Sequence, residues 1–414
     1  MANKEKLIDR PHYIDWLLRW KDRSVIKVVT GLRRCGKSSV LALFRDELLR
    51  QGTPPENITA INFESLEENY PLEAKPLYDY IVQHLSPGMN YVFLDEVQHV
   101  EEFERAVDGL GVRPDVDLYI TGSNAYFLSS ELATLLTGRY VELRMLPLSF
   151  AELRSAADAS TTDEELLNRY LVFGGMPFIT QLDDDQDIAD YLGGVFNTIV
   201  LGDVQRRHPR MGMRQFMGTA SFLADNIGNI TSQKKISAGL SASGSPASPA
   251  TVGEHLDALE KNYLFFKALR YDLKGKGYLS TLEKYYLGDL GFRYWLLGKQ
   301  QGDLGRRLEN AVYLELLRRY RKVDIGSTGG TEVDFVAWGT EGANYYQVSL
   351  SVLDEETFRR EMASLRAIPD NRPKYLLTMD RMGVGDHDGI RQECITDWLL
   401  KQGDRNAAAA SPKA

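Results

Sequence analysis

The sequence predicts an α/β protein whose first part is built on a mainly parallel sheet. Residues 24–150 alternate short runs rich in β-branched and aromatic residues with longer helical stretches. The runs expected to form buried strands are Val25–Thr30, Ile58–Phe63, Tyr91–Leu94, Leu118–Thr121 and Tyr140–Met145. Strands that are separated by helices need crossover connections, and such connections produce parallel strand pairs.

The composition is that of a globular protein. The 414 residues are 43% hydrophobic and 26% charged, which excludes collagen-like, wholly disordered and disulfide-framework chains. No run of about 18 apolar residues is present, and Met1–Arg10 lacks the apolar stretch of a secretory signal, so neither a membrane span nor export is expected. Cys35 and Cys394 are the only cysteines, which suits a reducing cytoplasm and excludes a cysteine-held metal cluster.

Beyond residue 150, three further parts and a tail are expected. Residues 151–205 look helical, with a break at Gly174–Pro177. Residues 206–300 have the order of a winged helix, in which helices are followed by a β-hairpin formed from 264–271 and 284–287, although a generic α+β connector fits the same order. Residues 301–405 return to an α/β pattern, and 406–414 are expected to be disordered.

A glycine-rich loop follows the first predicted strand. Gly31-Leu-Arg-Arg-Cys-Gly-Lys-Ser38 matches the Walker A pattern G-x-x-x-x-G-K-S/T between a predicted strand and a predicted helix. Glycines let the backbone curl so that successive N–H groups face phosphate oxygens at a helix N-terminus. Lys37 is expected to reach the β- and γ-phosphates, and the Ser38 hydroxyl to ligate Mg²⁺. The residues expected to bind ATP are Gly31, Leu32, Arg33, Arg34, Cys35, Gly36, Lys37, Ser38 and Ser39.

Polar residues end two later predicted strands. Asp95 is expected to hold Mg²⁺ beside the phosphate loop, and Glu96 to polarise the water that attacks the γ-phosphorus. Together with the loop, this acid pair favours ATP hydrolysis over nucleotide binding without turnover. Ser123 and Asn124 end the next strand, where either could sense the γ-phosphate or orient the water, although ordinary turn chemistry explains them as well.

One arginine precedes the last strand of the first part. Arg139 follows a predicted helix over Leu128–Thr137 and is expected to complete the site of a neighbouring subunit as an arginine finger. The alternative is a surface arginine that satisfies a helix C-terminus.

Together these features resemble the AAA+ ATPases. Leu146-Pro-Leu-Ser-Phe150 and Gly174-Gly-Met-Pro177 resemble a large prokaryotic group of them, in which a winged helix and a restriction-endonuclease-like domain follow the core. The fold implied is an AAA+ parallel sheet (1–150), a helical lid (151–205), a winged helix (206–300) and a restriction-endonuclease-like α/β domain (301–405). The resemblance also implies use of Mg²⁺ and ATP, and homo-oligomers such as hexameric rings or spirals. No lid arginine that acts as a second sensor can be assigned.

The C-terminal part carries an incomplete set of nuclease residues. Restriction-endonuclease-like nucleases use a helix Glu, a strand Asp and a Glu-x-Lys pair around Mg²⁺. Glu309 and Asp334 fit this pattern, but the third motif falls on Gln347 and Ser349, which supply neither the negative charge nor the cation. Nuclease activity is therefore not expected, and a scaffold or docking role is favoured.

Positive charge is concentrated in one segment of an acidic chain. The formal net charge is −9, yet residues 204–300 contain 14 Lys and Arg against 7 Asp and Glu. Such a segment is expected to contact DNA phosphates without reading sequence. The alternative is a solvated basic face that packs against the acidic core or a neighbouring subunit. The candidate contacts are Lys234, Lys235, Lys274, Lys276 and Lys284, with Arg206, Arg207, Arg210 and Arg214, and Lys274 and Lys276 would form the tip of the wing.

Two functions from different classes stay open. The first is an oligomeric motor or remodeller on branched or nonspecific DNA, for instance in fork unwinding or Holliday-junction branch migration. The second is an ATP-operated switch that binds a protein partner in stress or defence signalling.

Overall fold

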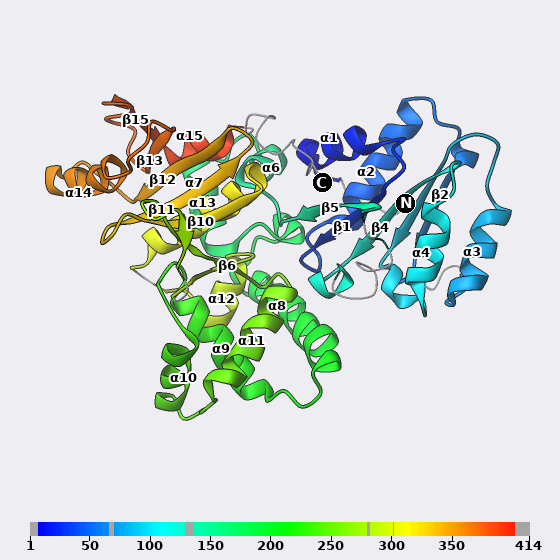
Figure 1. Cartoon of the computed structure of the whole chain (residues 1–414), viewed down its shortest axis with the longest axis horizontal. Helices are drawn as coiled ribbons and strands as arrows, with labels where there is room; N and C mark the ends of the chain where they lie inside the picture. The colour runs from blue at the N-terminus through cyan, green and yellow to red at the C-terminus, as the bar shows by residue number, and fades with distance from the viewer. Residues whose placement is uncertain are drawn as a thin grey trace. The chain divides into compact units, whose positions relative to one another are not determined.

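Figure 1 shows the computed structural model, which describes residues 7–65, 70–128, 136, 138–279, 282–300 and 302–401. Contacts divide the chain into a first unit, Met1–Pro147 with Lys261–Tyr263, and a second unit, Leu148–Glu260 with Leu264–Ala414. The main division lies close to the predicted boundary at residue 150. The boundaries predicted beyond it fall inside one unit and stay predictions. The tail and, except for Leu128 and Leu136, the helix predicted over 128–137 lie outside the described residues.

The first unit is a parallel sheet with the strand order β2-β3-β4-β1-β5 among the described residues. This confirms the predicted α/β class and all five predicted strands of the first part. The strands are β1 (Ile26–Gly31), β2 (Ile58–Asn62), β3 (Asn90–Asp95), β4 (Val116–Gly122) and β5 (Tyr140–Met145). The helices are α1 (Pro11–Trp20), α2 (Lys37–Arg50), α3 (Ala74–Gln83) and α4 (Phe103–Gly111), with short 3₁₀ turns η1 (Pro55–Asn57), η2 (Val97–His99) and η3 (Ala125–Leu128).

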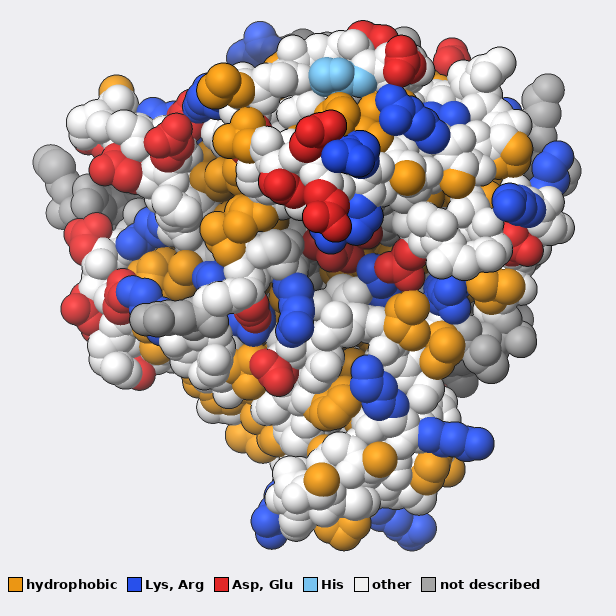
Figure 2. All heavy atoms as spheres, turned by 90° about the vertical axis from the view of Figure 1, so that its left-hand side faces the viewer, with side chains coloured by type: hydrophobic (Ala, Val, Ile, Leu, Met, Phe, Trp, Pro, Cys, Tyr) orange, Lys and Arg blue, Asp and Glu red, His pale blue; other side chains and the backbone are white. Residues whose placement is uncertain are grey.

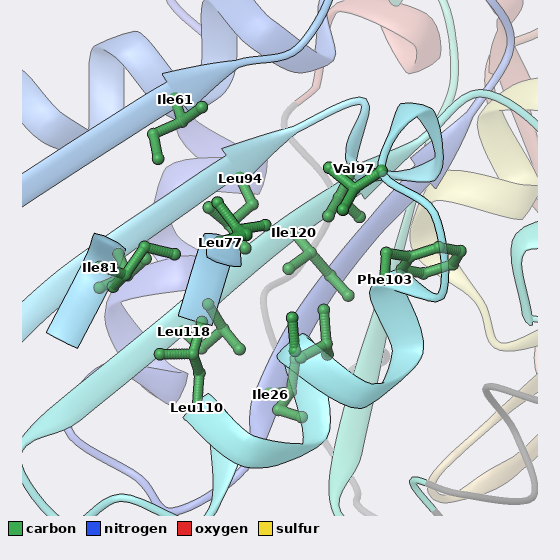
Figure 3. Close-up of a cluster of buried hydrophobic side chains, with 14 of the residues drawn as sticks. Ile26, Ile61, Leu77, Ile81, Leu94, Val97, Phe103, Leu110, Leu118 and Ile120 are labelled. Carbon is green, nitrogen blue, oxygen red and sulfur yellow. The ribbon is translucent and has the colours of Figure 1, made fainter. Parts of the chain in front are cut away.

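Helices cover both faces of this sheet. Leu77 and Ile81 of α3 and Leu110 of α4 pack on the strands from one side (Figure 3). The strand residues of that cluster labelled in Figure 3 are Ile26, Ile61, Leu94, Leu118 and Ile120. On the other side, the ring of Phe44 in α2 lies 5.2 Å from that of Tyr119. Burial on both faces explains why the central strands β1, β3 and β4 are nearly continuous hydrophobic runs in the sequence.

The second unit begins with helices α6 (Phe150–Ala156), α7 (Asp163–Phe173) and α8 (Asp185–Asn197), with a 3₁₀ turn η4 (Pro177–Gln181) before α8 and a π-helix η5 (Thr198–Gln205) after it. The predicted break at Gly174–Pro177 has a steric cause. A Cβ on Gly174 would lie 1.9 Å from a carboxylate oxygen of Asp289, and the other oxygen of that carboxylate accepts the N–H of Gly175 at 2.8 Å. Only glycine allows this close approach.

Three helices and two antiparallel strands follow. They are α9 (Met213–Asp225), α10 (Gln233–Ala242), α11 (Pro249–Lys261), β6 (Phe265–Ala268) and β9 (Lys284–Leu287). Between β6 and β9 the chain forms a second hairpin, β7 (Arg270–Asp272) and β8 (Gly277–Tyr278). Lys274 and Lys276 lie in the turn of this inner hairpin, and β7 also pairs with β10 of the C-terminal sheet. That these two lysines form the tip of a wing stays a prediction.

The rest of the second unit is a mixed sheet covered by helices. Its strand order is β14-β15-β13-β12-β11-β10-β7-β8 among the described residues. The additional strands are β10 (Lys322–Ser327), β11 (Glu332–Gly339), β12 (Gly342–Ser349), β13 (Lys374–Thr378), β14 (Gly385–His387) and β15 (Ile390–Cys394). The helices are α12 (Gly291–Leu297), α13 (Leu304–Arg319), α14 (Glu355–Arg366) and α15 (Ile395–Leu400). Within the described ranges, every helix is too short or too polar to cross a bilayer.

Candidate nucleotide-binding site

Loops from three strands meet at one edge of the first unit's sheet. Strands β3, β4 and β1 are parallel neighbours, so the loops that follow them leave the sheet at the same edge. The phosphate loop of residues 31–38 follows β1, the acid pair Asp95–Glu96 lies at the end of β3, and Ser123 lies at the end of β4. The structure thus brings together the three segments that the sequence had marked.

The phosphate loop has a backbone that its glycines permit. Gly31 and Gly36 have φ angles of 148° and 98°, and Arg34 also has a positive φ of 66°. A Cβ on Gly31 would lie 2.3 Å from the carbonyl oxygen of Met145. Helix α2 begins at Lys37 with Gly36 as its N-cap, so the free N–H groups of the first turn lie at the loop.

The other predicted loop residues differ in exposure. Leu32 and Cys35 are buried and contribute backbone groups, and Arg33 forms an ion pair of 2.6 Å with Glu64. Arg34 and Ser38 are exposed and Ser39 is half-buried.

Lys37 lies between the phosphate loop and the two polar strand ends. Its Nζ is 3.2 Å from the Ser123 hydroxyl, 3.6 Å from a carboxylate oxygen of Glu96, and 3.4 Å from the carbonyl oxygen of Gly31. The side chain is only 4% exposed. A phosphate held by the loop would therefore meet this ammonium group directly.

Asp95 lies beside Ser38. The carboxylate accepts hydrogen bonds from the hydroxyls of Ser38 and, at 2.6 Å, Thr121. Burial raises the pKa of Asp95 above its usual value, and these two hydrogen bonds only partly oppose it. The two oxygen ligands predicted for Mg²⁺ are thus adjacent.

Glu96 is held from several directions. Glu96 has a left-handed φ of 53°, and its backbone N–H donates to the Thr121 hydroxyl at 2.8 Å. Its carboxylate accepts hydrogen bonds from the side chains of Ser123 and Gln98. Burial alone would raise the pKa of Glu96, but the Lys37 ammonium and these hydrogen bonds outweigh it and lower the pKa. The carboxylate is therefore ionised at neutral pH, as a proton acceptor must be.

The two predicted sensor residues are used differently. Ser123 joins Lys37 to Glu96, as described above. The side-chain oxygen of Asn124 accepts the N–H of Phe127 at 3.2 Å, which is the turn chemistry considered as the alternative. The sequence analysis gave no role to Gln98 and Thr121. Their positions in the sequence do not indicate that their side chains contact Asp95 and Glu96.

Arg139 lies away from these groups. Its carbonyl accepts the N–H of Ile26 at the amino end of β1, and Gly31 of the phosphate loop lies five residues further along this strand, roughly 16–17 Å away. Its guanidinium is 44% exposed and lies 2.8 Å from Asp108 of α4. An action within its own subunit's site is thus excluded by this placement, and an action on a neighbour stays a prediction.

Comparison with known proteins identifies the family. A family model described as an AAA domain matches residues 23–154, and another, described as a domain of unknown function (DUF8612), matches 164–303. An uncharacterized protein of Haemophilus influenzae is 38% identical over 401 residues, which cover 95% of this chain and 99% of the relative. The chain belongs to the P-loop ATPase family.

Other relatives of this P-loop ATPase are more distant. An uncharacterized protein of Methanocaldococcus jannaschii is 28% identical over 393 residues, which cover 89% of this chain and 83% of that protein. Among solved structures, a Walker-type ATPase of Pyrococcus abyssi is similar with a TM-score of 0.49 and 16% identity, over 71% of this chain and 97% of that one.

Four of the five lysines predicted to contact DNA lie on the surface of the second unit. Lys234 and Lys235 are exposed in the first turn of α10, and Lys274 and Lys276 are exposed at the β7–β8 tip. Figure 2 faces the second unit and shows Lys and Arg side chains around its lower lobe. The arginines predicted with them, Arg206, Arg207, Arg210 and Arg214, are also exposed.

The prediction that Lys284 contacts DNA is wrong. Its side chain is 5% exposed, and its Nζ lies 2.8 Å from a carboxylate oxygen of Glu332 and 3.2 Å from one of Glu309. Burial alone would lower the pKa of Lys284, but Glu309, Asp334 and Glu332 outweigh it and raise the pKa. The sequence alone does not distinguish a buried lysine at the start of an apolar strand from an exposed one, so the burial of Lys284 could not be predicted.

Lys284 thus lies among the acids of the nuclease-like pattern. Burial and the charge of Glu309 raise the pKa of Asp334 far above its usual value, and its carboxylate accepts the N–H of Val348 at 2.8 Å. Gln347 donates to Glu361 at 2.8 Å and accepts the N–H of Asp334 at 3.3 Å. Among the described residues, no three or more His, Cys, Asp or Glu side chains are grouped to hold a metal ion. Asp334 and Gln347 thus take part in hydrogen bonds within the protein, and the absence of nuclease activity stays a prediction.

Proposed function

We propose that this protein hydrolyses ATP with Mg²⁺ at the edge of the sheet where β1, β3 and β4 end. The observation that carries the proposal is the position of the ionised Glu96 carboxylate. It lies 3.6 Å from the ammonium group of Lys37, which belongs to the phosphate loop. Glu96 accepts a hydrogen bond from Ser123, and Ser123 accepts one from the buried Lys37, so this serine links the acid and the lysine beside the phosphate loop.

The donor set fits both groups that hydrolysis requires. The N–H groups of the phosphate loop and the first turn of α2 would bind the phosphates, and the oxygens of Ser38 and Asp95 are the hard ligands that Mg²⁺ prefers. Bound Mg²⁺ would neutralise charge on the phosphate oxygens.

The side chains of the site then have separate roles. Glu96 accepts the proton of the attacking water, and Ser123 orients the Glu96 carboxylate. Lys37 stabilises the negative charge that develops on the γ-phosphoryl oxygens. In a homo-oligomer, for instance a hexameric ring or spiral, Arg139 of one subunit would contact the nucleotide of the next.

Release of inorganic phosphate from ATP tests the proposal. Lys37→Ala should abolish tight nucleotide binding, whereas Glu96→Gln should bind ATP but hydrolyse it on the order of 10²–10⁴-fold more slowly. Lys75→Ala is a matched control, because Lys75 is a surface lysine that contacts Asp79 and Tyr78 of its own helix. Unchanged turnover in Glu96→Gln would contradict the assigned role.

The substrate of the motor is proposed to be DNA. The support is the excess of positive charge in residues 204–300 and the exposure of four of its arginines and four of its lysines. These are Arg206, Arg207, Arg210, Arg214, Lys234, Lys235, Lys274 and Lys276. These cations suit phosphate contacts and therefore branched or nonspecific DNA. The proposed location is the cytoplasm, where the buried free thiols of Cys35 and Cys394 stay reduced.

DNA-dependent stimulation of hydrolysis separates this proposal from a protein-binding switch. Hydrolysis is measured with junction, fork and linear DNA at several salt concentrations. A motor on DNA should be stimulated, and the stimulation should fall steeply as salt rises. Equal hydrolysis with and without every DNA would overturn the DNA part and leave the ATPase intact.

A further inference from the structure

Arg10 is a buried arginine just before α1, and the sequence did not single it out. The residue is 3% exposed. Its Nη1 donates to the carbonyl of Cys35 at 2.9 Å, and its Nη2 donates to the carbonyls of Leu146 and Pro147 at 2.9 and 3.2 Å. Its guanidinium carbon lies 4.5 Å from the centre of the Tyr13 ring. A buried guanidinium is costly unless its donors are satisfied, and the fork of arginine satisfies several acceptors at once.

The first acceptor belongs to the phosphate loop. Cys35 lies between Arg34 and Gly36, both of which have positive φ angles. Because a trans peptide places its C=O and N–H on opposite sides, a fixed Cys35 carbonyl also fixes the direction of the Gly36 N–H. With its carbonyl turned to Arg10, the peptide directs that N–H away from Arg10, as a phosphate-binding loop requires.

The other two acceptors lie where the chain leaves the first unit. Leu146 and Pro147 directly follow β5 and end that unit. The N–H of Leu146 donates to the hydroxyl of Tyr13 at 3.1 Å, so Arg10 and Tyr13 hold this exit segment together. One guanidinium therefore contacts both the phosphate loop and the exit segment, Leu146–Pro147.

We propose that Arg10 is a positioning residue for the phosphates of ATP, and that it couples nucleotide binding to the exit segment. It acts through the Cys35–Gly36 peptide and does not touch the nucleotide. The proposal rests on the proposed ATPase function. When the Gly36 N–H binds a phosphate, the hydrogen bonds of Arg10 hold the exit segment in place, and without Arg10 the two move independently.

The first test is nucleotide affinity in Arg10→Gln and Arg10→Lys, with Arg19→Gln as control because Arg19 is exposed on α1. The dissociation constants of ADP and ATP are measured with Mg²⁺, together with kcat and KM. Arg10→Gln should bind both nucleotides on the order of 10–100-fold more weakly, which corresponds to one lost hydrogen bond to a charged group, while kcat at saturation changes little. The nucleotide affinity of Arg10→Lys should lie between those of Arg10→Gln and the wild type, because an ammonium group keeps the charge but not the forked donors of the guanidinium.

The second test is hydrogen exchange across residues 143–150. In the wild type, saturating ADP should slow exchange there, and in Arg10→Gln saturated with ADP it should not. A folded Arg10→Gln protein with wild-type affinity would overturn the positioning role. Weakened binding with an unchanged exchange response would overturn the coupling. If the wild type itself binds no nucleotide, the proposed ATPase function fails. If the wild type binds ATP but Arg10→Gln has unchanged affinity or an unchanged exchange response, only the proposed role of Arg10 fails.

Discussion

Replacing Lys284 with methionine should destabilise the second unit, because it leaves the carboxylates of Glu309 and Glu332 without their cation. Breaking a buried ion pair by removing one partner typically costs about 3–5 kcal/mol. The side chains of Glu309 and Glu332 are 17% and 31% exposed, so water screens part of the uncompensated charge and the lower end, about 3 kcal/mol, is expected. For a unit of this size, such a loss lowers Tm by roughly 6–12 °C.

Thermal and urea unfolding measure this loss. Lys276→Met is the matched control, because Lys276 is exposed at the β7–β8 tip, and its Tm should stay close to that of the wild type. The double variant Lys284→Met with Glu309→Gln should recover part of the loss, since it removes one of the unpaired charges. A Lys284→Met protein within about 1 kcal/mol of the wild type, or a double variant no more stable than the single, would refute the ion-pair account.

Three other predictions follow from the geometry. Arg139→Ala should slow hydrolysis by roughly 10³-fold or more, and mixing it with a variant that lacks the phosphate-loop lysine should restore part of the activity; no recovery would argue against a shared site. Burial raises the pKa of Asp289 to about 7, so the folded state keeps a proton that the unfolded chain releases near pH 4. Stability measured by urea unfolding should therefore fall as pH rises from about 4 to about 7, by at most about 1.4 kcal/mol per pH unit, and this fall should be shallower in Asp289→Asn; equal slopes would contradict it. Charge reversal of Lys274 and Lys276 to Glu should weaken DNA binding and lower its salt dependence without changing basal hydrolysis, and unaltered DNA binding would remove the β7–β8 tip from the contact surface.

The ATPase core could be predicted because its signals are local. A strand, a glycine-rich loop and a helix follow one another within residues 25–50, and parallel pairing then places the ends of β1 and β3 at the same edge of the sheet by general rules. The location of Asp95–Glu96 at this edge could therefore be predicted without any knowledge of tertiary contacts.

The partners that orient the site could not be predicted in this way. The acceptors of Arg10 lie 25, 136 and 137 residues away, and Lys284 meets Glu309 across 25 residues. Burial decides whether such a charge is a surface contact or an internal ion pair, and no periodic pattern marks the difference. The same holds for the β7–β8 hairpin, because its sheet is set by its partner β10 and not by its own residues.

The pairing of β7 with β10 also determines which fragments of the chain can fold. A fragment that starts at residue 302 would leave one edge of β10 bare, since β7 supplies its partner there, and an unpaired edge invites association with other chains. The same fragment would lose the lysine that neutralises Glu309 and Glu332. The C-terminal sheet should therefore be soluble and folded only when expressed together with the strands that precede it.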